Sequence, residues 1–338
     1  MNELFTEKKK EALAGEKAEG MDIMGALVKN SYGPNGTTKP KVPTGDYERQ
    51  ALNDSEILGN AFVFLLAGHE TSAGALHYGL IFLALHPDSQ RRLQRDIDRI
   101  FGDRPIDEWN YNKDIAAMQN SMLGAVMQEE LRLVPPVINI PKQVSDERDQ
   151  VVIVDGRETV WPKGAGVNLG ALALQRNPKY WPSMGPSKVT DKDDDLEDFV
   201  PERWLAGNMQ QDTEAKEARV DLSAGHLYHP MKGSYIPFSD GARSCLGKRF
   251  AQVEIMILFA MIFKLYSVEL AVDSVADDVV DKMSPQERIE LYNKERDSAR
   301  TVIRNFSMVR ITVQIKNADI PIRLVPRGRE RFINLLDS

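Results

Sequence analysis

Residues 238–247 read F-S-D-G-A-R-S-C-L-G and contain the only cysteine of the chain. A single thiol forms no internal disulfide, so its value lies in packing, reactivity or ligation. Gly241 and Gly247 allow a tight turn and a close approach of the backbone to a flat ligand. The sequence predicts a helix over 248–266, whose N-terminal N–H groups and dipole favour a thiolate just before it. Arg243 adds a fixed cation that suits a carboxylate.

A thiolate in such a loop is one of the recognised ligands of haem iron. The pattern Phe-x-x-Gly-x-Arg-x-Cys-x-Gly resembles the haem-binding signature of the cytochrome P450 superfamily. A buried structural cysteine is the alternative, but this set of identities arises by chance in fewer than roughly one chain in a thousand. The resemblance implies that Cys245 is the proximal ligand of haem iron, that Arg243 binds a haem propionate, and that Phe238 packs beside the sulfur.

The composition is that of an ordinary soluble protein, with 42% hydrophobic and 28% charged residues. At 338 residues, one large domain or two small ones are both open. The net charge of −7 argues against nucleic acid as a partner. One cysteine cannot supply an internal disulfide, which suits a reducing compartment. Residues 1–20 show no apolar signal segment, and the sequence assigns no location, although eukaryotic members of the superfamily are anchored in the endoplasmic reticulum by an N-terminal helix.

Hydrophobic periodicity predicts a mainly α protein with a small β-sheet. We expect an N-terminal helix and flexible loop over 1–50, followed by one haem-thiolate domain over 51–338. Helices are expected over 11–29, 55–85, 88–101, 116–133, 248–266 and 284–303. Short strands are expected over 151–154, 159–161 and 166–169, and 309–315 is expected to form a closing hairpin with 320–325. The acidic run 191–195 is expected to be a solvated loop.

The segment 67–71, A-G-H-E-T, interrupts the apolar helix expected over 55–85. A mid-helix glycine costs about 1 kcal/mol against alanine, and polar groups in an apolar run are costly unless paired. These residues alone leave a kinked helix and a functional site equally open. The segment resembles the family's oxygen-activation motif, which implies that Thr71 steadies bound oxygen and Glu70 takes part in proton delivery, with Ser72 assisting. A membrane span over 61–85 is disfavoured, because an ionised group in mid-bilayer is costly.

Glu129 and Arg132 lie three residues apart on an expected helix, where an ordinary exposed ion pair is the default interpretation. The pair resembles the family's Glu-x-x-Arg, whose partner is an arginine in a later Pro-Glu-Arg segment, here Arg203. The resemblance implies a buried charge-assisted network that holds the loop beneath the haem. Its role is structural.

The sequence Pro135-Pro136 followed by Pro141-Lys142 resembles the family segment that runs along the haem edge. Lys142 stands where the family often has an arginine, which implies a contact with a propionate; a solvated lysine is the alternative. Residues 137–140, beside 61–64 and Ala67, are then expected to line an apolar substrate pocket. Gln175 stands where a family turn more often begins with histidine, which leaves the hydrogen bonding of that position open.

The resemblance implies monooxygenation with haem b as cofactor: one atom of O2 enters an apolar small molecule and the other is reduced to water. No flavin or nicotinamide segment is found, so electrons are expected from NADPH through a separate reductase. The match runs from about residue 54 to 270, as in a cytochrome P450 fold that lacks its N-terminal third. The rival interpretation is a non-catalytic, truncated haem-binding remnant. The long loops resemble fungal members of the family, for which specialised metabolism is a common setting.

Overall fold

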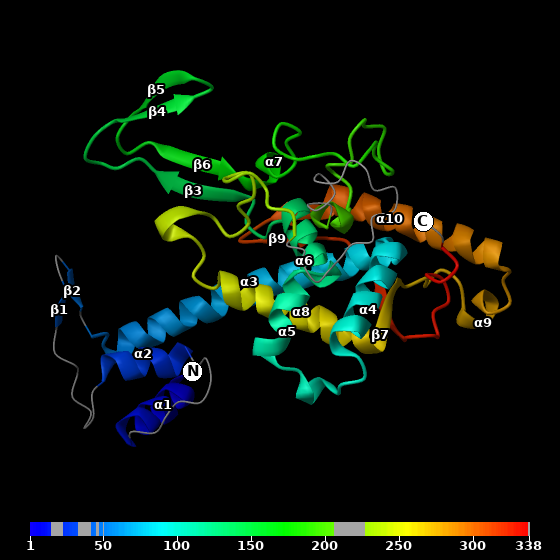
Figure 1. The fold of residues 1–338 in the computed structure, drawn as a ribbon, viewed down its shortest axis with the longest axis horizontal. Coiled ribbons are helices and arrows are strands. Elements are labelled where there is room, and N and C mark those ends of the chain that lie inside the picture. Colours follow the sequence, from blue (N-terminus) through cyan, green and yellow to red (C-terminus); the bar gives the residue numbers. More distant parts are fainter. Residues whose placement is uncertain (15–22, 33–41, 45–46, 50, 206–226, 337–338) are drawn as a thin grey trace. The chain divides into compact units, whose positions relative to one another are not determined.

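The computed structural model describes residues 1–14, 23–32, 42–44, 47–49, 51–205 and 227–336. Its fold is mainly helical with small two-stranded sheets, as predicted (Figure 1). The α-helices are α1 (Asn2–Ala14), α2 (Ile23–Ser31), α3 (Asp54–Leu85), α4 (Pro87–Phe101), α5 (Tyr111–Gln119), α6 (Met122–Leu133), α7 (Ala171–Leu174), α8 (Lys248–Leu265), α9 (Asp277–Val280) and α10 (Pro285–Phe306). The short 3₁₀ helices are η1 (Ile106–Glu108), η2 (Pro201–Trp204) and η4 (Gly241–Arg243).

The described strands pair two by two, and all five pairs are antiparallel. These pairs are β1 (Val42–Thr44) with β2 (Tyr47–Arg49), β3 (Asn139–Gln143) with β6 (Gly166–Gly170), β4 (Gln150–Val154) with β5 (Arg157–Trp161), β7 (Tyr266–Leu270) with β10 (Ile322–Pro326), and β8 (Ser307–Val309) with β9 (Val313–Ile315).

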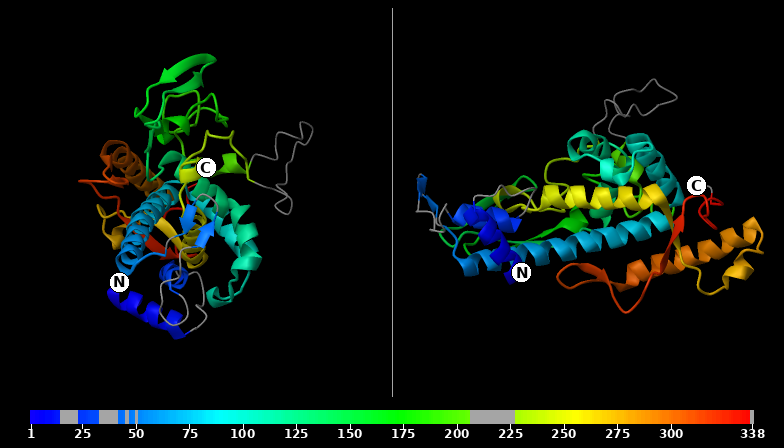
Figure 2. Two further views of the ribbon diagram at one scale, coloured as in Figure 1. Left: turned by 90° about the vertical axis from the view of Figure 1, so that its left-hand side faces the viewer. Right: turned by 90° about the horizontal axis from the view of Figure 1, so that it is seen from below.

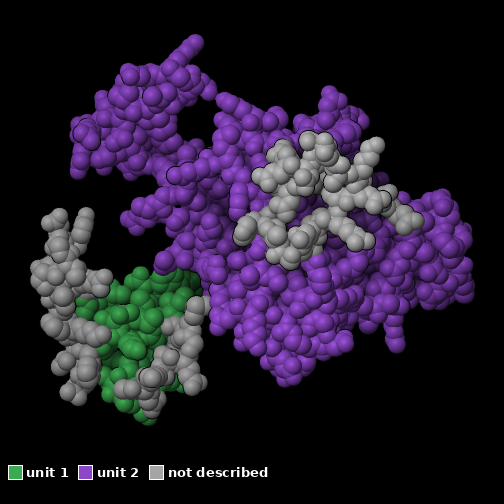
Figure 3. Space-filling model, in the orientation of Figure 1, with its two compact units in different colours: residues 1–70 green, residues 71–338 purple. Residues whose placement is uncertain are grey.

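The chain divides into two compact units, residues 1–70 and 71–338, coloured separately in Figure 3. The first unit has its own small core of Phe5, Met24, Val28 and Ile57. The expected helix over 11–29 is wrong in its bounds, because α1 ends at Ala14 and α2 begins at Ile23, with 15–22 outside the described residues. Most of the expected flexible loop also lies outside them. The division into domains 1–50 and 51–338 stays a prediction.

In the second unit, α4, α6 and α8 pack together with the end of α3. Helix α4 shows the required periodicity, since Leu93, Ile97 and Phe101 recur every four residues and are all buried. At Gly79 of α3 the ring of Phe259 on α8 lies so close that an added Cβ would clash with it. Along this contact α3 and α8 run side by side in the same direction (Figures 1 and 2).

The single helix expected over 116–133 is wrong, because the chain breaks it into α5 and α6. Ser121 caps the new helix, with its side chain accepting a hydrogen bond from Leu123 N at 3.2 Å. An added Cβ at Gly124 would clash with the carbonyl of Gln119, so glycine permits the tight junction. The break at Asn120 and Ser121 allows the axis of α6 to differ from that of α5.

Two expectations about strands are corrected. The segments 309–315 and 320–325 do not form a hairpin, because β9 pairs with β8 and β10 pairs with β7. The pairing of β10 places it beside the buried residues Val268 and Leu270. Strand β3, the partner of β6, is absent from the sequence-based assignment; its Pro141 argues against a strand there, since proline is tolerated only where no ladder hydrogen bond is needed.

Candidate cofactor site

The cysteine loop is built by short backbone contacts just before α8. Cys245 N donates to the carbonyl oxygen of Phe238 at 2.8 Å, and Ser244 N donates to that of Gly241 at 3.1 Å. Gly241 has φ +80°, which glycine adopts without penalty. Gly247 has φ −83° and needs no such freedom; its Cα instead lies next to the thiol, since an added Cβ would be 4.0 Å from Cys245 Sγ.

The thiol is exposed, as are Arg243 and the apolar neighbours of the loop. Leu246 is 82% exposed and Phe250 54% exposed, so apolar surface surrounds the only sulfhydryl group. The cysteine precedes the N-terminus of α8, as predicted. Phe238 is half-buried, and Lys248 Nζ lies 5.8 Å from the centre of its ring.

Lys142 is joined to this loop. Its Nζ donates to Ser239 Oγ at 3.1 Å, which links β3 to the residues just after Phe238. Ser239 has φ +60°, a backbone conformation that a residue other than glycine keeps only when its surroundings enforce it. The lysine side chain is half-buried. Its hydrogen bond joins Lys142 to the loop that carries Phe238, Arg243 and Cys245.

The predicted oxygen-activation motif lies within α3. Glu70 and Thr71 are both half-buried, and Ser72 is buried. Within the second unit, Thr71 precedes the contact of Gly79 with Phe259 by about two turns of α3.

The Glu-x-x-Arg prediction is confirmed as a fully buried network. Arg132 donates to both carboxylate oxygens of Glu129 at 2.8 Å, and Arg203 Nε donates to Glu129 Oε1 at 2.9 Å. The three side chains have no exposed surface. The indole of Trp204 and the backbone N–H of Val200 also donate to this carboxylate, at 2.8 and 3.0 Å. The carboxylate of Glu129 therefore has four partners, and three of them, Val200, Arg203 and Trp204, join α6 to η2 and its N-cap.

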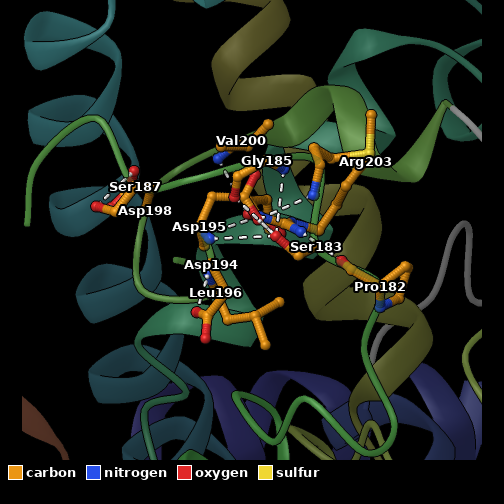
Figure 4. Close-up of polar contacts among 12 residues, drawn as sticks. Pro182, Ser183, Gly185, Ser187, Asp194, Asp195, Leu196, Asp198, Val200 and Arg203 are labelled. Atoms are coloured by element: carbon orange, nitrogen blue, oxygen red, sulfur yellow. Dashed lines mark hydrogen bonds and ion pairs between the residues drawn. The ribbon is translucent and has the colours of Figure 1, made fainter. Parts of the chain in front are cut away.

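The network continues to the last residue of the acidic run. Residues 191–193 are exposed, as expected of a solvated loop, but Asp195 is buried. Asp195 is 4% exposed and accepts an ion pair from Arg203 Nη2 at 3.2 Å (Figure 4). Asp195 Oδ1 also accepts from Ser183 Oγ at 3.2 Å and from Met184 N at 3.1 Å. Asp198 is buried as well, and accepts from Ser187 Oγ at 2.9 Å. Sequence reasoning missed these partners because runs of acidic residues are usually solvated.

The two neighbouring glutamates of α6 differ in their surroundings. Burial alone would raise the pKa of Glu129, but the charges of Arg132 and Arg203 outweigh it and hold this pKa below its usual value. Glu130 is equally buried, and among the described residues neither of its carboxyl oxygens has a hydrogen-bond partner. Burial therefore raises the pKa of Glu130 well above its usual value. The sequence gives no sign of this difference.

A cavity of about 500 Å³ lies away from the cysteine loop. It is bounded by the end of α3, the end of α6 and α10, and neither Cys245 nor Thr71 lines it. Of the residues expected to line the substrate pocket, Ile138 does so here. In the described part of the chain, no three His, Cys, Asp or Glu side chains form a metal-binding group, and no helix is long and apolar enough to cross a membrane.

The residues at the loop fit a haem. A cysteine thiolate is one of the recognised ligands of haem iron, the exposed apolar residues Leu246 and Phe250 of the same segment would suit the porphyrin, and two cations, Arg243 and Lys142, would suit its propionates. These side chains, on a mainly helical fold with a buried Glu–Arg–Arg network, are the groups that a haem-thiolate site would require.

Comparison with known proteins gives the family. The cytochrome P450 family profile matches residues 1–291, and the chain belongs to that family. It is 32% identical over 265 residues to a cytochrome P450 monooxygenase of Arthrobotrys oligospora, covering 75% of this chain and 42% of the relative. It is 29% identical over 270 residues to a cytochrome P450 monooxygenase of Penicillium rubens, covering 75% and 44%.

A crystal structure of a cytochrome P450 shares the fold, with a TM-score of 0.55 at 22% identity, over 82% of this chain and 47% of that one. The chain thus spans less than half the length of the curated relatives it matches.

Proposed function

We propose that the chain binds haem b through the thiolate of Cys245 and acts as a monooxygenase on an apolar small molecule. The observation that carries the proposal is the exposed thiol before α8, in a loop fixed by Phe238 and by Lys142 on Ser239. Membership of the cytochrome P450 family supports it. When bound, the haem supplies the activation of O2, from which one oxygen atom passes to the substrate.

The proposal gives each side chain a task. The Cys245 sulfur ligates the iron, Phe238 shields it, and Arg243 and Lys142 hold the propionates by charge-assisted hydrogen bonds. As the resemblance to the family implies, Thr71 and Glu70 would hold and pass protons; both are half-buried on α3.

The remaining parts of the proposal concern partners. Electrons come from NADPH through a separate reductase, as the resemblance to the family implies. The substrate is apolar, in keeping with the side chains of residues 137–140, and specialised metabolism is the proposed setting by analogy with fungal relatives.

A second candidate is a protein that binds haem but turns nothing over. The exposure of Cys245 and of its neighbour Leu246 favours it, because monooxygenation needs a site that excludes water.

The deciding experiment is the absorption spectrum of the reduced, carbon-monoxide-bound protein after expression with haem. A strongly red-shifted Soret band identifies thiolate ligation, and Cys245→Ala is expected to lose it completely. Ser244→Ala, at the adjacent exposed position, is the matched control and is expected to keep it. Stoichiometric haem with the same band in Cys245→Ala would refute the proposal.

A second test separates the enzyme from the non-catalytic candidate. With a reductase and a substrate found by screening, Thr71→Ala is expected to keep haem but to consume more NADPH per product. Thr159→Ala, an exposed threonine of β5, is the control. Unchanged coupling in Thr71→Ala would make Thr71 structural, and no turnover by the wild type would favour the non-catalytic candidate.

A further inference from the structure

Gln175 occupies a junction between α6 and the cysteine loop. Its side chain has no exposed surface, and its Nε2 donates to the carbonyl oxygens of Leu131 at 3.1 Å and Arg132 at 3.0 Å. Its Oε1 accepts from Ile236 N at 2.9 Å. The amide of Gln175 thus donates two hydrogen bonds to the backbone at the end of α6 and accepts one from the backbone of Ile236.

Ile236 is where the chain enters the cysteine loop. Its carbonyl oxygen accepts from Ser239 N at 3.0 Å, and the next link is the bond from Cys245 N to the Phe238 carbonyl at 2.8 Å. Ile236 is 5% exposed and packs against Ile140 and Ala171. Water therefore has little access to its N–H group, and losing the bond to Gln175 would leave a buried donor unsatisfied, which costs free energy.

We propose that Gln175 is a positioning residue of the cysteine loop: by clamping Ile236 to the end of α6, it holds Cys245 where its sulfur ligates haem iron. The inference rests on the proposed function. The hydrogen bonds of Gln175 also explain why glutamine suits a position where the family turn more often has histidine. A neutral imidazole offers one donor and one acceptor, whereas the amide provides the two donors and one acceptor that are used here.

The chain contains a matched control. Gln90 of α4 also has no exposed surface, and its Nε2 donates to the carbonyl oxygens of Leu83 and Val268, both at 2.9 Å. Its Oε1 accepts from Val268 N at 2.8 Å. The number and type of bonds are those of Gln175, but they join α4 to the end of α3 and to β7. Gln90→Leu therefore removes the same interactions without touching the cysteine loop.

The experiment compares Gln175→Leu with Gln90→Leu in the full chain by two measurements. The first is the share of the ferrous carbon-monoxide complex that shows the red-shifted thiolate band. We expect Gln175→Leu to lower the ratio of thiolate to non-thiolate complex about fivefold relative to Gln90→Leu, which corresponds to roughly 1 kcal/mol. The second is hydrogen exchange of the haem-free chain, in which Gln175→Leu is expected to speed exchange over 234–246 about tenfold. Gln90→Leu is expected to speed it over 266–270 instead.

The outcomes are separable. Equal exchange over 234–246 in both variants, or equal thiolate ratios despite different exchange, overturns the inference. A wild type with no thiolate band refutes the proposed function, and the exchange measurement then decides by itself whether Gln175 positions the loop. If Gln175→Leu fails to fold, Gln175→Asn is measured in its place. It keeps the amide but is one methylene shorter, so an unchanged loop in that variant also overturns the inference.

Discussion

Two neighbouring substitutions on α6, Glu129→Gln and Glu130→Gln, are expected to change stability in opposite directions. Both replace a fully buried carboxyl group by an amide of the same size. Both positions are glutamates of α6, and both have no exposed surface. Only the partners of the carboxyl groups differ.

For Glu129→Gln we expect a large loss of stability. The substitution removes the one negative charge that lies between Arg132 and Arg203, and the new amide N–H₂ group faces donors that need an acceptor. Removing one partner of a buried ion pair costs about 3–5 kcal/mol. For a chain of this size the loss lowers the melting temperature by roughly 6–10 °C.

The pH dependence has a definite sign. The pKa of Glu129 lies below its usual value of 4.5 in the folded protein, so its stabilising contribution is present above pH 4.5. It is lost as the pH falls through the lower, folded-state pKa. The Glu129→Gln variant lacks this term, so the stability difference between wild type and variant narrows in acid.

For Glu130→Gln we expect no loss of stability below pH 4.5, and a gain over the wild type that grows as the pH rises above 4.5. Burial raises the pKa of Glu130 well above 4.5, so the unfolded chain releases this proton before the folded one does. The wild type therefore loses stability as the pH rises above 4.5 toward the folded-state pKa. Replacing the carboxyl group by a neutral amide removes that slope.

The assay is thermal unfolding followed by tryptophan fluorescence at several pH values between 3 and 8, on wild type and both variants. Equal losses for the two variants at pH 7, or a loss confined to Glu130→Gln, would refute the reasoning. A parallel pH slope in wild type and Glu130→Gln would show that Glu130 has a partner.

Two further predictions concern packing and the cofactor site. Gly79→Ala is expected to lower stability by about 1–3 kcal/mol, because its Cβ clashes with Phe259; Gly74→Ala on the same helix, with its nearest atom at 3.8 Å, is expected to cause no loss in the same melting assay. Lys142→Met breaks the 3.1 Å bond to Ser239 and removes a cation, and we expect haem to bind roughly 3–10-fold more weakly by titration. An equal effect from the same change at an exposed lysine elsewhere would contradict this.

The sequence by itself determined the features that depend on a short stretch of chain. The pattern around Cys245 needs only ten consecutive residues, and the helix that follows it begins where the glycine and the apolar periodicity place it. The amphipathic α4 and the long α3 were predicted close to their observed bounds for the same reason. Local propensity and periodicity are properties of neighbouring residues, so they can be read without knowing the fold.

The tertiary structure decided which groups are buried and with whom they pair. Nothing local distinguishes Glu129 from Glu130, or marks Asp195 as a partner of Arg203 rather than a solvated acid. The pairing of β10 with β7 likewise joins segments far apart in the sequence. A buried charge is tolerated only when its partners arrive from elsewhere in the chain, and the cost of leaving it unpaired is set by burial. The burial of a charged group and the identity of its partners are both fixed only once the chain has folded.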